Sequence, residues 1–211
     1  MEKTEAKSRK SKSRKSPGRI NRRDQIVSAT EKLIRSQGLS GVTTRQIAEA
    51  VGCSEGALYV HFEGRVELLL AVLEESLPDM LQPLHALTAA VGQNTPQQNL
   101  ETAVGGILAF HRRVIPMLAS LFAEPELLAS YQKSLARNDG GPHRAIARIA
   151  DYMRSEQALG RIGRDVDANM AAILLMSASF FRIFSERFFG QPMTPPLDQF
   201  VKQLVASITA L

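Results

Sequence analysis

The stretch from Thr43 to Phe62 constrains the fold of this 211-residue chain more than any other. Thr43 and Gln46 have the three-residue spacing of a capping box, in which a hydroxyl and an amide satisfy backbone donors at a helix start. Gly52 supplies the permissive backbone of a sharp turn, and Ser54 is a strong cap for a following helix. The sequence therefore predicts two short helices joined by a tight turn.

Apolar side chains recur at helical spacing in both predicted helices. Ile47 and Ala48 fall on one face of the first helix, and Leu58 and Phe62 fall on one face of the second. A small residue at Ala48 lets the helices approach closely, while Leu58 fills the angle between them. This pattern is typical of a helix-turn-helix, which places its second helix in a DNA groove. An ordinary helical hairpin that only packs is the alternative.

Three side chains that can donate hydrogen bonds to phosphate lie next to the apolar anchors. Tyr59, His61 and Arg65 cluster at one helix terminus, beside the capped and positively polarised start of a helix, where phosphates are favoured. Taken singly, a His is more often a packed or solvated residue, and a Tyr is more often half-buried core. Their clustering favours DNA contact.

The fixed positions of residues 43–65 resemble the signature of the tetracycline-repressor (TetR) family of bacterial transcription regulators. They comprise Thr-Thr-Arg-x-Ile-Ala-x-x-Val-Gly, then Ser, then Leu-Tyr-x-His-Phe followed three residues later by a basic residue. The resemblance covers about Ile26 to Leu70, and the rest of the chain matches the family in length, helicity and layout. Family members usually carry Lys where this chain has Arg65, which Gly64 precedes. The resemblance implies an all-helical homodimer that binds an operator and responds to a small molecule.

The polar side chains of the motif are assigned to DNA by their chemistry. Arg45 is expected to contact a base edge, and Glu55 is expected to accept from a cytosine amino group. Phosphate contacts position a protein on duplex DNA without specifying sequence. The expected phosphate contacts are Thr44, Tyr59, His61 and Arg65, and the positions expected to face the groove are Ser54, Glu55, Gly56 and Ala57.

The positive charge of the chain is concentrated at its amino end. Residues 1–23 carry ten Lys or Arg against two Glu, whereas the remainder carries 16 basic and 19 acidic residues. Residues 1–20 contain almost nothing apolar, so we expect a disordered basic arm. Such an arm neutralises DNA phosphates or enters a minor groove, adding salt-dependent affinity. A solubilising extension is the alternative.

Beyond the motif, the sequence predicts helices separated by Pro and Gly, and no segment alternates with period two, so no sheet is expected. A helix over 22–37, capped by Asn21, completes a three-helix unit. A long helix starting at Arg65 contains Pro78 and Pro83, each of which bends or breaks a helix. Further helices are predicted at 97–114, 117–123, 126–137, 143–158, 167–189 and 196–210.

The last two predicted helices are apolar over broad surfaces. The helix at 167–189 is apolar on more than one face, and the helix at 196–210 carries a wide apolar stripe. Two such helices from each of two subunits can form a four-helix interface, which the resemblance also implies. A twofold dimer then places two recognition helices one or more DNA turns apart. The alternative is that these side chains fill the core of a single chain.

Apolar and soft side chains between the motif and the last helices are candidates for an effector pocket, because small-molecule sites prefer such linings. The resemblance implies that effectors bind in this part of the chain. For each residue taken singly, plain core packing is the alternative. The candidates are Phe110, His111, Met117, Leu121, Phe122, Tyr131, Met153 and Met176.

Other classes of function find no support in the sequence. The four His residues lack neighbours at metal-ligand spacing, and Gly-rich phosphate loops and Gly-x-Ser-x-Gly elbows are absent, so no catalytic residue, metal or cofactor is expected. Cys53 permits no intrachain disulfide and is interpreted as a small half-buried residue, with a redox sensor as the alternative. The longest apolar stretch, from Met170 to Phe181, is shorter than the roughly 18 to 20 residues that span a bilayer. We therefore expect a cytoplasmic protein without membrane contact.

These features predict an all-α protein in three parts. Residues 1–20 form the basic arm, 21–66 form a three-helix helix-turn-helix DNA-binding domain, and 67–211 form a larger helical effector-binding and dimerisation domain. The expected function is that of a transcriptional repressor, which a small molecule releases from a palindromic operator of double-stranded DNA. A constitutive architectural DNA-binding protein without an effector is the alternative.

Overall fold

The computed structural model describes residues 21–38, 41–137 and 139–209, and every regular element among these residues is an α-helix. The predicted all-α fold is therefore confirmed, whereas the predicted basic arm at 1–20 lies outside the described residues. The elements are α1 (Arg22–Gln37), α2 (Thr44–Val51), α3 (Glu55–Tyr59), α4 (Arg65–Ala89), α5 (Pro96–Leu121), α6 (Pro125–Arg137), α7 (Pro142–Ala158), α8 (Ala168–Phe189) and α9 (Leu197–Thr209).

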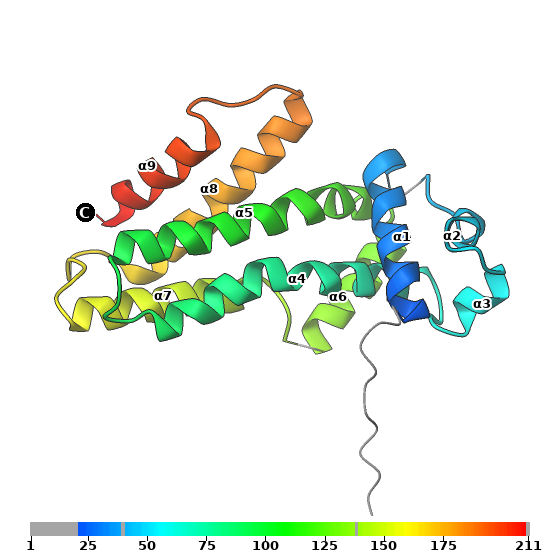
Figure 1. The fold of residues 1–211 in the computed structure, drawn as a ribbon, viewed down its shortest axis with the longest axis horizontal. Coiled ribbons are helices and arrows are strands. Elements are labelled where there is room, and N and C mark those ends of the chain that lie inside the picture. The colour runs from blue at the N-terminus through cyan, green and yellow to red at the C-terminus, as the bar shows by residue number, and fades with distance from the viewer. Residues whose placement is uncertain (1–20, 39–40, 138, 210–211) are drawn as a thin grey trace, which may run out of the picture.

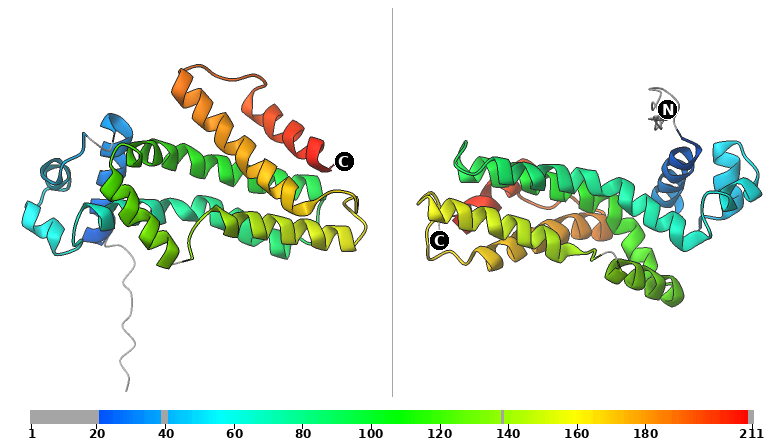
Figure 2. Two further views of the ribbon diagram at one scale, coloured as in Figure 1. Left: turned by 180° about the vertical axis from the view of Figure 1, so that it is seen from behind. Right: turned by 90° about the horizontal axis from the view of Figure 1, so that it is seen from below.

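The helices form an elongated molecule with α1, α2 and α3 at one end (Figure 1). Helices α4 and α5 run along the long axis as a contacting pair, and α7 and α8 pack against them. Seen from behind, α8 crosses α5, and α9 returns beside α8 (Figure 2). The three-helix end is therefore connected to a body of longer helices through α4 and α5.

Buried side chains form two hydrophobic cores along this axis. The amino-terminal core joins α1, α2, α3 and the start of α4, and it also takes in Met117 and Leu121 of α5 and Leu127 of α6. The body core fills the space between α4, α5, α7, α8 and α9, with Ile107 and Ile149 fully buried. The domain boundary predicted between residues 66 and 67 falls within the amino-terminal core, so the end of α5 and α6 help to support the first three helices.

The prolines do not divide the helices as the sequence predicts. Helix α4 is continuous through Pro78 and Pro83, and α5 is continuous through Pro116, so the predicted break into two helices at Pro116 is wrong. A proline removes one backbone hydrogen bond, but tertiary packing can outweigh that loss. Val114 and Met117, on either side of Pro116, are almost fully buried and hold the helix in place.

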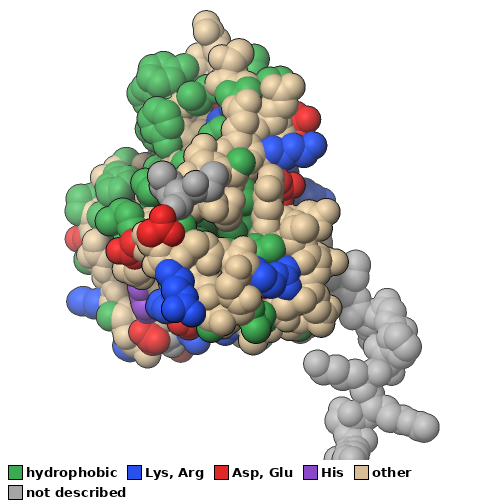
Figure 3. Space-filling view, turned by 90° about the vertical axis from the view of Figure 1, so that its left-hand side faces the viewer, with side chains coloured by type: hydrophobic (Ala, Val, Ile, Leu, Met, Phe, Trp, Pro, Cys, Tyr) green, Lys and Arg blue, Asp and Glu red, His purple; other side chains and the backbone are tan. Residues whose placement is uncertain are grey.

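Helix α8 is the most apolar long helix of the structure and leaves large apolar side chains on its surface. Figure 3 shows hydrophobic side chains gathered at the upper left, at the height that α8 and α9 occupy in Figure 1. The burial of α8 is incomplete because no other side chain in the described part of the chain covers these residues. Its exposed apolar residues are Met170, Leu174, Phe180, Phe181, Phe188 and Phe189.

By length and composition alone, α8 is also able to cross a membrane, which differs from the expectation based on 170–181. Half of its most apolar 18-residue window is buried in the structure. The core helix of a soluble protein meets the same criterion, so the finding does not assign α8 to a membrane.

Candidate nucleic-acid interface

Helix α2 begins and ends where the sequence predicts. The Thr43 hydroxyl accepts from the Gln46 N–H at 3.2 Å, and the Gln46 side-chain oxygen accepts from the Thr43 N–H at 2.9 Å, which completes the capping box. At the other end, Gly52 adopts a left-handed conformation with φ of 69°. The N–H of Cys53 then donates to the Ala48 carbonyl at 2.9 Å and closes the turn.

Helix α3 is short and is fixed by buried anchors. The Ser54 hydroxyl accepts from the Ala57 N–H at 3.3 Å, so Ser54 caps the helix as predicted. Leu58 and Phe62 are each only 3% exposed and lie in the amino-terminal core. The Phe62 N–H donates to the Leu58 carbonyl at 2.9 Å, which keeps the chain turning after α3 ends.

The outer face of α3 is open to solvent at the extreme end of the molecule (Figure 1). Ser54, Glu55 and Gly56 are exposed, Ala57 is partly exposed, and Tyr59 is 57% exposed. A Cβ added at Gly56 would meet only the Ser54 hydroxyl oxygen, at 3.9 Å, so the backbone can be approached closely here. The five residues share an accessible surface, as a groove-reading helix requires.

Arg45, the predicted base-edge contact, projects from α2 between carboxylates. Its guanidinium pairs with Glu49 at 3.0 Å, and both side chains are largely exposed. Glu49 raises the pKa of Arg45 through this hydrogen bond and its charge, with a smaller contribution from the charge of Glu55. The Thr44 hydroxyl donates to Glu55 at 2.7 Å, so the starts of α2 and α3 are cross-linked by residues that the sequence assigns to DNA.

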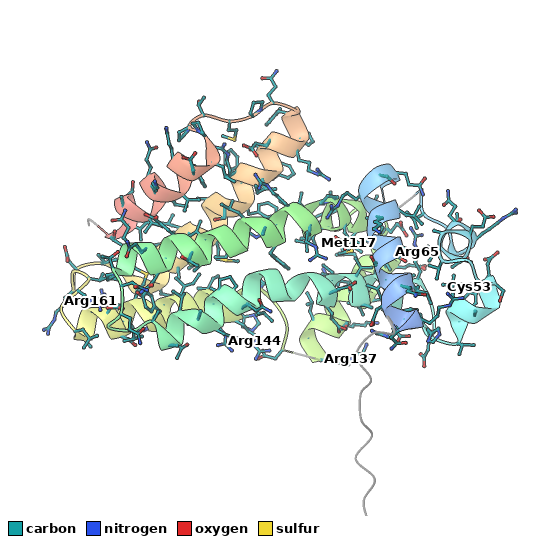
Figure 4. The ribbon with its side chains drawn as sticks, in the orientation of Figure 1. Cys53, Arg65, Met117, Arg137, Arg144 and Arg161 are labelled. Carbon is teal, nitrogen blue, oxygen red and sulfur yellow. The ribbon has the colours of Figure 1, made fainter. Side chains whose placement is uncertain are left out.

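Arg65, a predicted phosphate contact, is bound to another part of the protein. Its guanidinium pairs with Glu124 at 3.0 Å, and Glu124 lies in the short connection between α5 and α6. Figure 4 places Arg65 beside α1, close to the end of α5 that carries Met117. His61, the remaining phosphate candidate, is half-buried. The candidate interface is thus connected to the body of the molecule through Arg65.

Two cations that the sequence analysis counted with the amino-terminal charge belong to the fold. Arg22 donates to the carbonyls of Val51 at 3.3 Å and Gly52 at 3.4 Å, and so caps the end of α2. Arg23 lies over the ring of Phe62, 5.0 Å from its centre. Both side chains hold α1 against the helix-turn-helix. The sequence indicates this role only through their position inside the predicted helix at 22–37.

Comparisons with known proteins identify this domain. Residues 26–72 match the family described as bacterial regulatory proteins, tetR family. The amino-terminal domain belongs to the TetR family. The TetR-type domain therefore comprises α1, α2, α3 and the first turns of α4, which are the elements that make up the candidate interface.

Curated relatives of the chain match over short segments. The nucleoid occlusion factor SlmA of Vibrio cholerae is 41% identical over 63 residues, which are 28% of this chain and 32% of that protein. The HTH-type transcriptional regulator SrpR of Pseudomonas putida is 43% identical over 51 residues, which are 24% of each protein. The chain thus spans about a third or less of the length of these relatives.

Solved structures extend the likeness to the whole fold. A TetR transcription regulator from Haloarcula marismortui matches with a TM-score of 0.69 and 16% identity, over 90% of this chain and 96% of the other. A TetR/AcrR-family regulator from Thermobifida fusca matches with a TM-score of 0.60 and 21% identity, over 89% and 96%. The arrangement of a helix-turn-helix domain on a larger helical body is therefore the TetR fold.

The eight candidates for an effector pocket do not converge on one cavity. Met117, Leu121 and Tyr131 belong to or pack against the amino-terminal core, whereas Phe110, Met153 and Met176 belong to or pack against the body core. Phe122 is 77% exposed. His111 is the candidate whose surroundings are unusual for a core residue.

His111 is a buried imidazole with an unpartnered ring nitrogen. The ring is 5% exposed, and burial lowers its pKa to about 4, against a smaller opposing effect of a hydrogen bond to the Ser179 backbone. The ring is therefore neutral at pH 7, with one nitrogen donating and the other accepting. Its buried Nδ1 has no hydrogen-bond partner. The rings of Phe110 and Phe180 lie 5.7 and 5.5 Å from the imidazole, measured between centres.

The fully buried carboxylate of the body has a structural role that the sequence analysis did not identify. Glu156 accepts from the Gly92 N–H at 3.1 Å and pairs with Arg161 at 3.2 Å, which fixes the α4–α5 connection against α7. Among the described residues, no group of three or more His, Cys, Asp or Glu side chains is arranged to hold a metal ion.

Proposed function

We propose that this protein is a DNA-binding transcriptional regulator whose helix α3 enters the major groove of an operator. The observation that carries the proposal is the contrast within α3, where Ser54, Glu55 and Gly56 are exposed while Leu58 is buried in the core of a TetR-type domain. Such a helix is rigidly anchored and presents its start outward. Because the chromosome is the binding partner, the proposal places the protein in the cytoplasm.

The residue roles follow from exposure and donor chemistry. Arg45 exchanges Glu49 for a base edge, and Thr44 and Arg65 turn from their carboxylate partners to phosphates. Tyr59 adds a further phosphate contact, as does His61 from its half-buried position. The groove-facing residues are those assigned from the sequence, Ser54, Glu55, Gly56 and Ala57.

The proposal includes a homodimer formed through α8 and α9. Leu174 and Phe181 are 46% and 59% exposed and lie seven residues apart, so they share one side of α8. An apolar surface of this kind on a helix marks a contact site with another protein surface. A twofold contact presents two α3 helices to a palindromic operator, whose half-sites repeat the symmetry of the protein.

We further propose that an effector binds beside His111 and weakens operator binding, so that the protein acts as a repressor. The unpartnered Nδ1 suits a ligand with a hydrogen-bond donor and an apolar or aromatic body. Arg113, two residues further along α5, makes a two-pronged pair with Glu31 of α1 at 2.9 and 3.0 Å. A shift of α5 on binding therefore reaches the DNA-binding domain directly, as allosteric coupling requires.

The DNA part of the proposal is tested by selecting bound duplexes from a random-sequence library with the purified full-length chain. The expected result is one enriched palindromic motif. The control is a Leu58→Asp variant, which puts a charge in the core that anchors α3. This variant should lose specific binding because α3 is no longer held in place. Enrichment of no motif, with binding that falls steeply with salt for every duplex, would instead support a constitutive architectural protein.

The effector part is tested separately, by screening aromatic and aliphatic hydrogen-bond donors for compounds that shift the melting temperature. A true effector raises the melting temperature of the wild-type chain, lowers its operator affinity, and loses both effects with His111→Phe. A compound that acts equally on wild-type and His111→Phe proteins contradicts the assignment of the site.

A further inference from the structure

A groove outside the helix-turn-helix is lined by arginines from three helices. It encloses about 320 Å³, within the size range of small-molecule sites. Figure 1 shows the carboxyl ends of α1 and α8 on the same side of α5, and the groove lies between these three helices. The lining residues are Arg35 of α1, Arg112 of α5, and Ile183, Glu186 and Arg187 of α8.

The positive charge of this groove is not balanced by its neighbours. Arg112 and Arg187 are exposed, and neither makes an ion pair or hydrogen bond with another residue in the part of the chain that the structure describes. By contrast, Arg35 pairs with Glu31 at 3.0 Å. Two guanidiniums therefore face solvent across a concave surface without a carboxylate of their own.

The carboxylates nearest to the groove are already engaged by other cations. Glu186 accepts from Arg182 at 2.7 Å, and Arg182 is itself only 3% exposed. Glu31 is shared between Arg35 and Arg113, at 3.0 and 2.9 Å. Rearranging either carboxylate toward Arg112 or Arg187 would take the carboxylate from a less exposed guanidinium, which is costly.

We propose that this groove binds a small anion of the phosphate or carboxylate class that carries at least two negative charges. Guanidinium groups present planar forks that match the oxygens of such anions, and pairs with carboxylate or phosphate are frequently bidentate. Ile183 adds an apolar side chain to the lining, and Arg112 of α5 and Arg187 of α8 supply donors from two different helices. The site uses none of the residues assigned to DNA or to the His111 pocket.

The position of Arg35 gives the site a structural consequence. Arg35 belongs to the last turn of α1 in the TetR-type domain, whereas Arg112 and Arg187 belong to the body. An anion held by all three links the two parts of the molecule. Removing Arg35 weakens binding less than removing the other two, because Arg35 already has Glu31 as a partner.

The test is calorimetric titration of the full-length chain with pyrophosphate, with chloride used to hold the ionic strength constant. The compared proteins are the wild type, the double variant Arg112→Gln/Arg187→Gln, and Arg164→Gln. Arg164 is an exposed arginine in the α7–α8 connection, at the opposite end of the long axis (Figure 1), so its variant shows the effect of losing one positive charge outside the groove. Circular dichroism confirms that each variant is folded.

The expected result is saturable binding to the wild-type chain, at least tenfold weaker binding to the double variant, and unchanged binding to Arg164→Gln. Citrate, tested in the same way, shows whether carboxylates are accepted as well as phosphates. Non-saturable binding to the wild type, or equal affinity of all three proteins, overturns the proposal. The proposal is also overturned if the wild type does not bind pyrophosphate and the double variant loses affinity for duplex DNA. That result would assign the two arginines to contacts with the DNA backbone.

Discussion

At the scale of single residues, the candidate interface consists of polar side chains whose partners within the protein are exchangeable. Arg45 pairs with Glu49, and Arg65 pairs with Glu124, both at 3.0 Å and both with substantial exposure. Exposed ion pairs of this kind contribute about 0 to 1 kcal/mol. A phosphate or a base edge can therefore replace the carboxylate at little cost to the fold.

Arg45 and Arg65 are expected to differ in how their loss affects sequence recognition. Arg45→Ala should cost about 1 to 3 kcal/mol on the operator and relax specificity, because a base-edge contact is lost, while Arg65→Ala should weaken all duplexes similarly. Fluorescence anisotropy with operator and scrambled duplexes measures both effects. Equal losses on the two duplexes for both variants would contradict this division of roles.

His111 makes the stability of the protein depend on pH in a defined direction. Burial lowers its pKa from 6.5 to about 4, so between these values the unfolded chain binds a proton that the folded chain does not. The stability associated with the neutral ring is complete above pH 6.5 and is lost as the pH falls toward 4. The size of the full effect is on the order of 3 kcal/mol.

Urea denaturation of the wild type and His111→Phe at pH 7 and pH 4.5 measures this contribution. The wild type should lose more stability on acidification than His111→Phe, which has no titrating group at this position. Parallel losses in the two proteins would show that the buried imidazole does not carry the predicted pH dependence.

At the scale of elements, the sequence predicts well those features that are determined by residues close together in the chain. The capping box at Thr43 and the turn at Gly52 are local, and both have the predicted geometry. The effector candidates depend instead on which helix faces which, and periodicity does not contain that information. Phe110 and Met117 are seven residues apart and share one side of α5, yet Phe110 packs against the body core and Met117 is buried in the amino-terminal core.

The contrast between local sequence and tertiary packing also explains why α5 continues through Pro116 and why His111 is buried. Pro116 has a low helix propensity, but burial of the residues around it keeps α5 continuous. His111 stands beside two arginines in sequence, which suits a solvated face, whereas the packing of α5 on α8 buries it against Phe180. Tertiary packing decided both outcomes, and a single sequence does not specify it.

Gly52 is predicted to be necessary for the turn between α2 and α3. With φ of 69°, an added Cβ meets no atom within 4 Å but forces a non-glycine residue into the left-handed region, so Gly52→Ala should destabilise the protein by about 1 kcal/mol. Gly105→Ala is a matched control, because Gly105 lies exposed within α5 and also has open space around its Cβ position.

Chemical denaturation of the two alanine variants gives the comparison. Gly105→Ala should leave stability unchanged or raise it by up to about 1 kcal/mol, because alanine has the higher helix propensity. A stability for Gly52→Ala equal to or above that of the wild type would mean that the left-handed conformation is not required.

At the scale of the whole molecule, the proposed operator recognition depends on twofold symmetry. One TetR-type domain presents a single short α3, whose five residues offer a small contact area. A dimer doubles that contact and fixes the spacing of the two helices, and the exposed apolar side of α8 is the surface available for it. In the proposed dimer, the anion groove and the Arg113–Glu31 pair both join the TetR-type domain to the body of its own chain.

Phe181→Glu should convert the protein to a monomer at micromolar concentrations, because it places a charge on the proposed interface. Leu159→Glu is the control, since Leu159 is 55% exposed at the end of α7 and carries the same type of substitution away from α8. Sedimentation velocity distinguishes the two species. A wild-type chain that is already monomeric, or a Phe181→Glu chain that remains dimeric, would exclude α8 as the interface.

A hydroxyl-radical footprint of the full-length chain on its selected operator tests whether two α3 helices bind the DNA together. A symmetric dimer should give two protected patches related by a twofold axis, with centres about 34 to 36 Å apart or a multiple of that spacing. Both patches should disappear together in Phe181→Glu at concentrations where the wild type is bound. A single protected patch, or uniform protection that does not depend on sequence, would contradict the account.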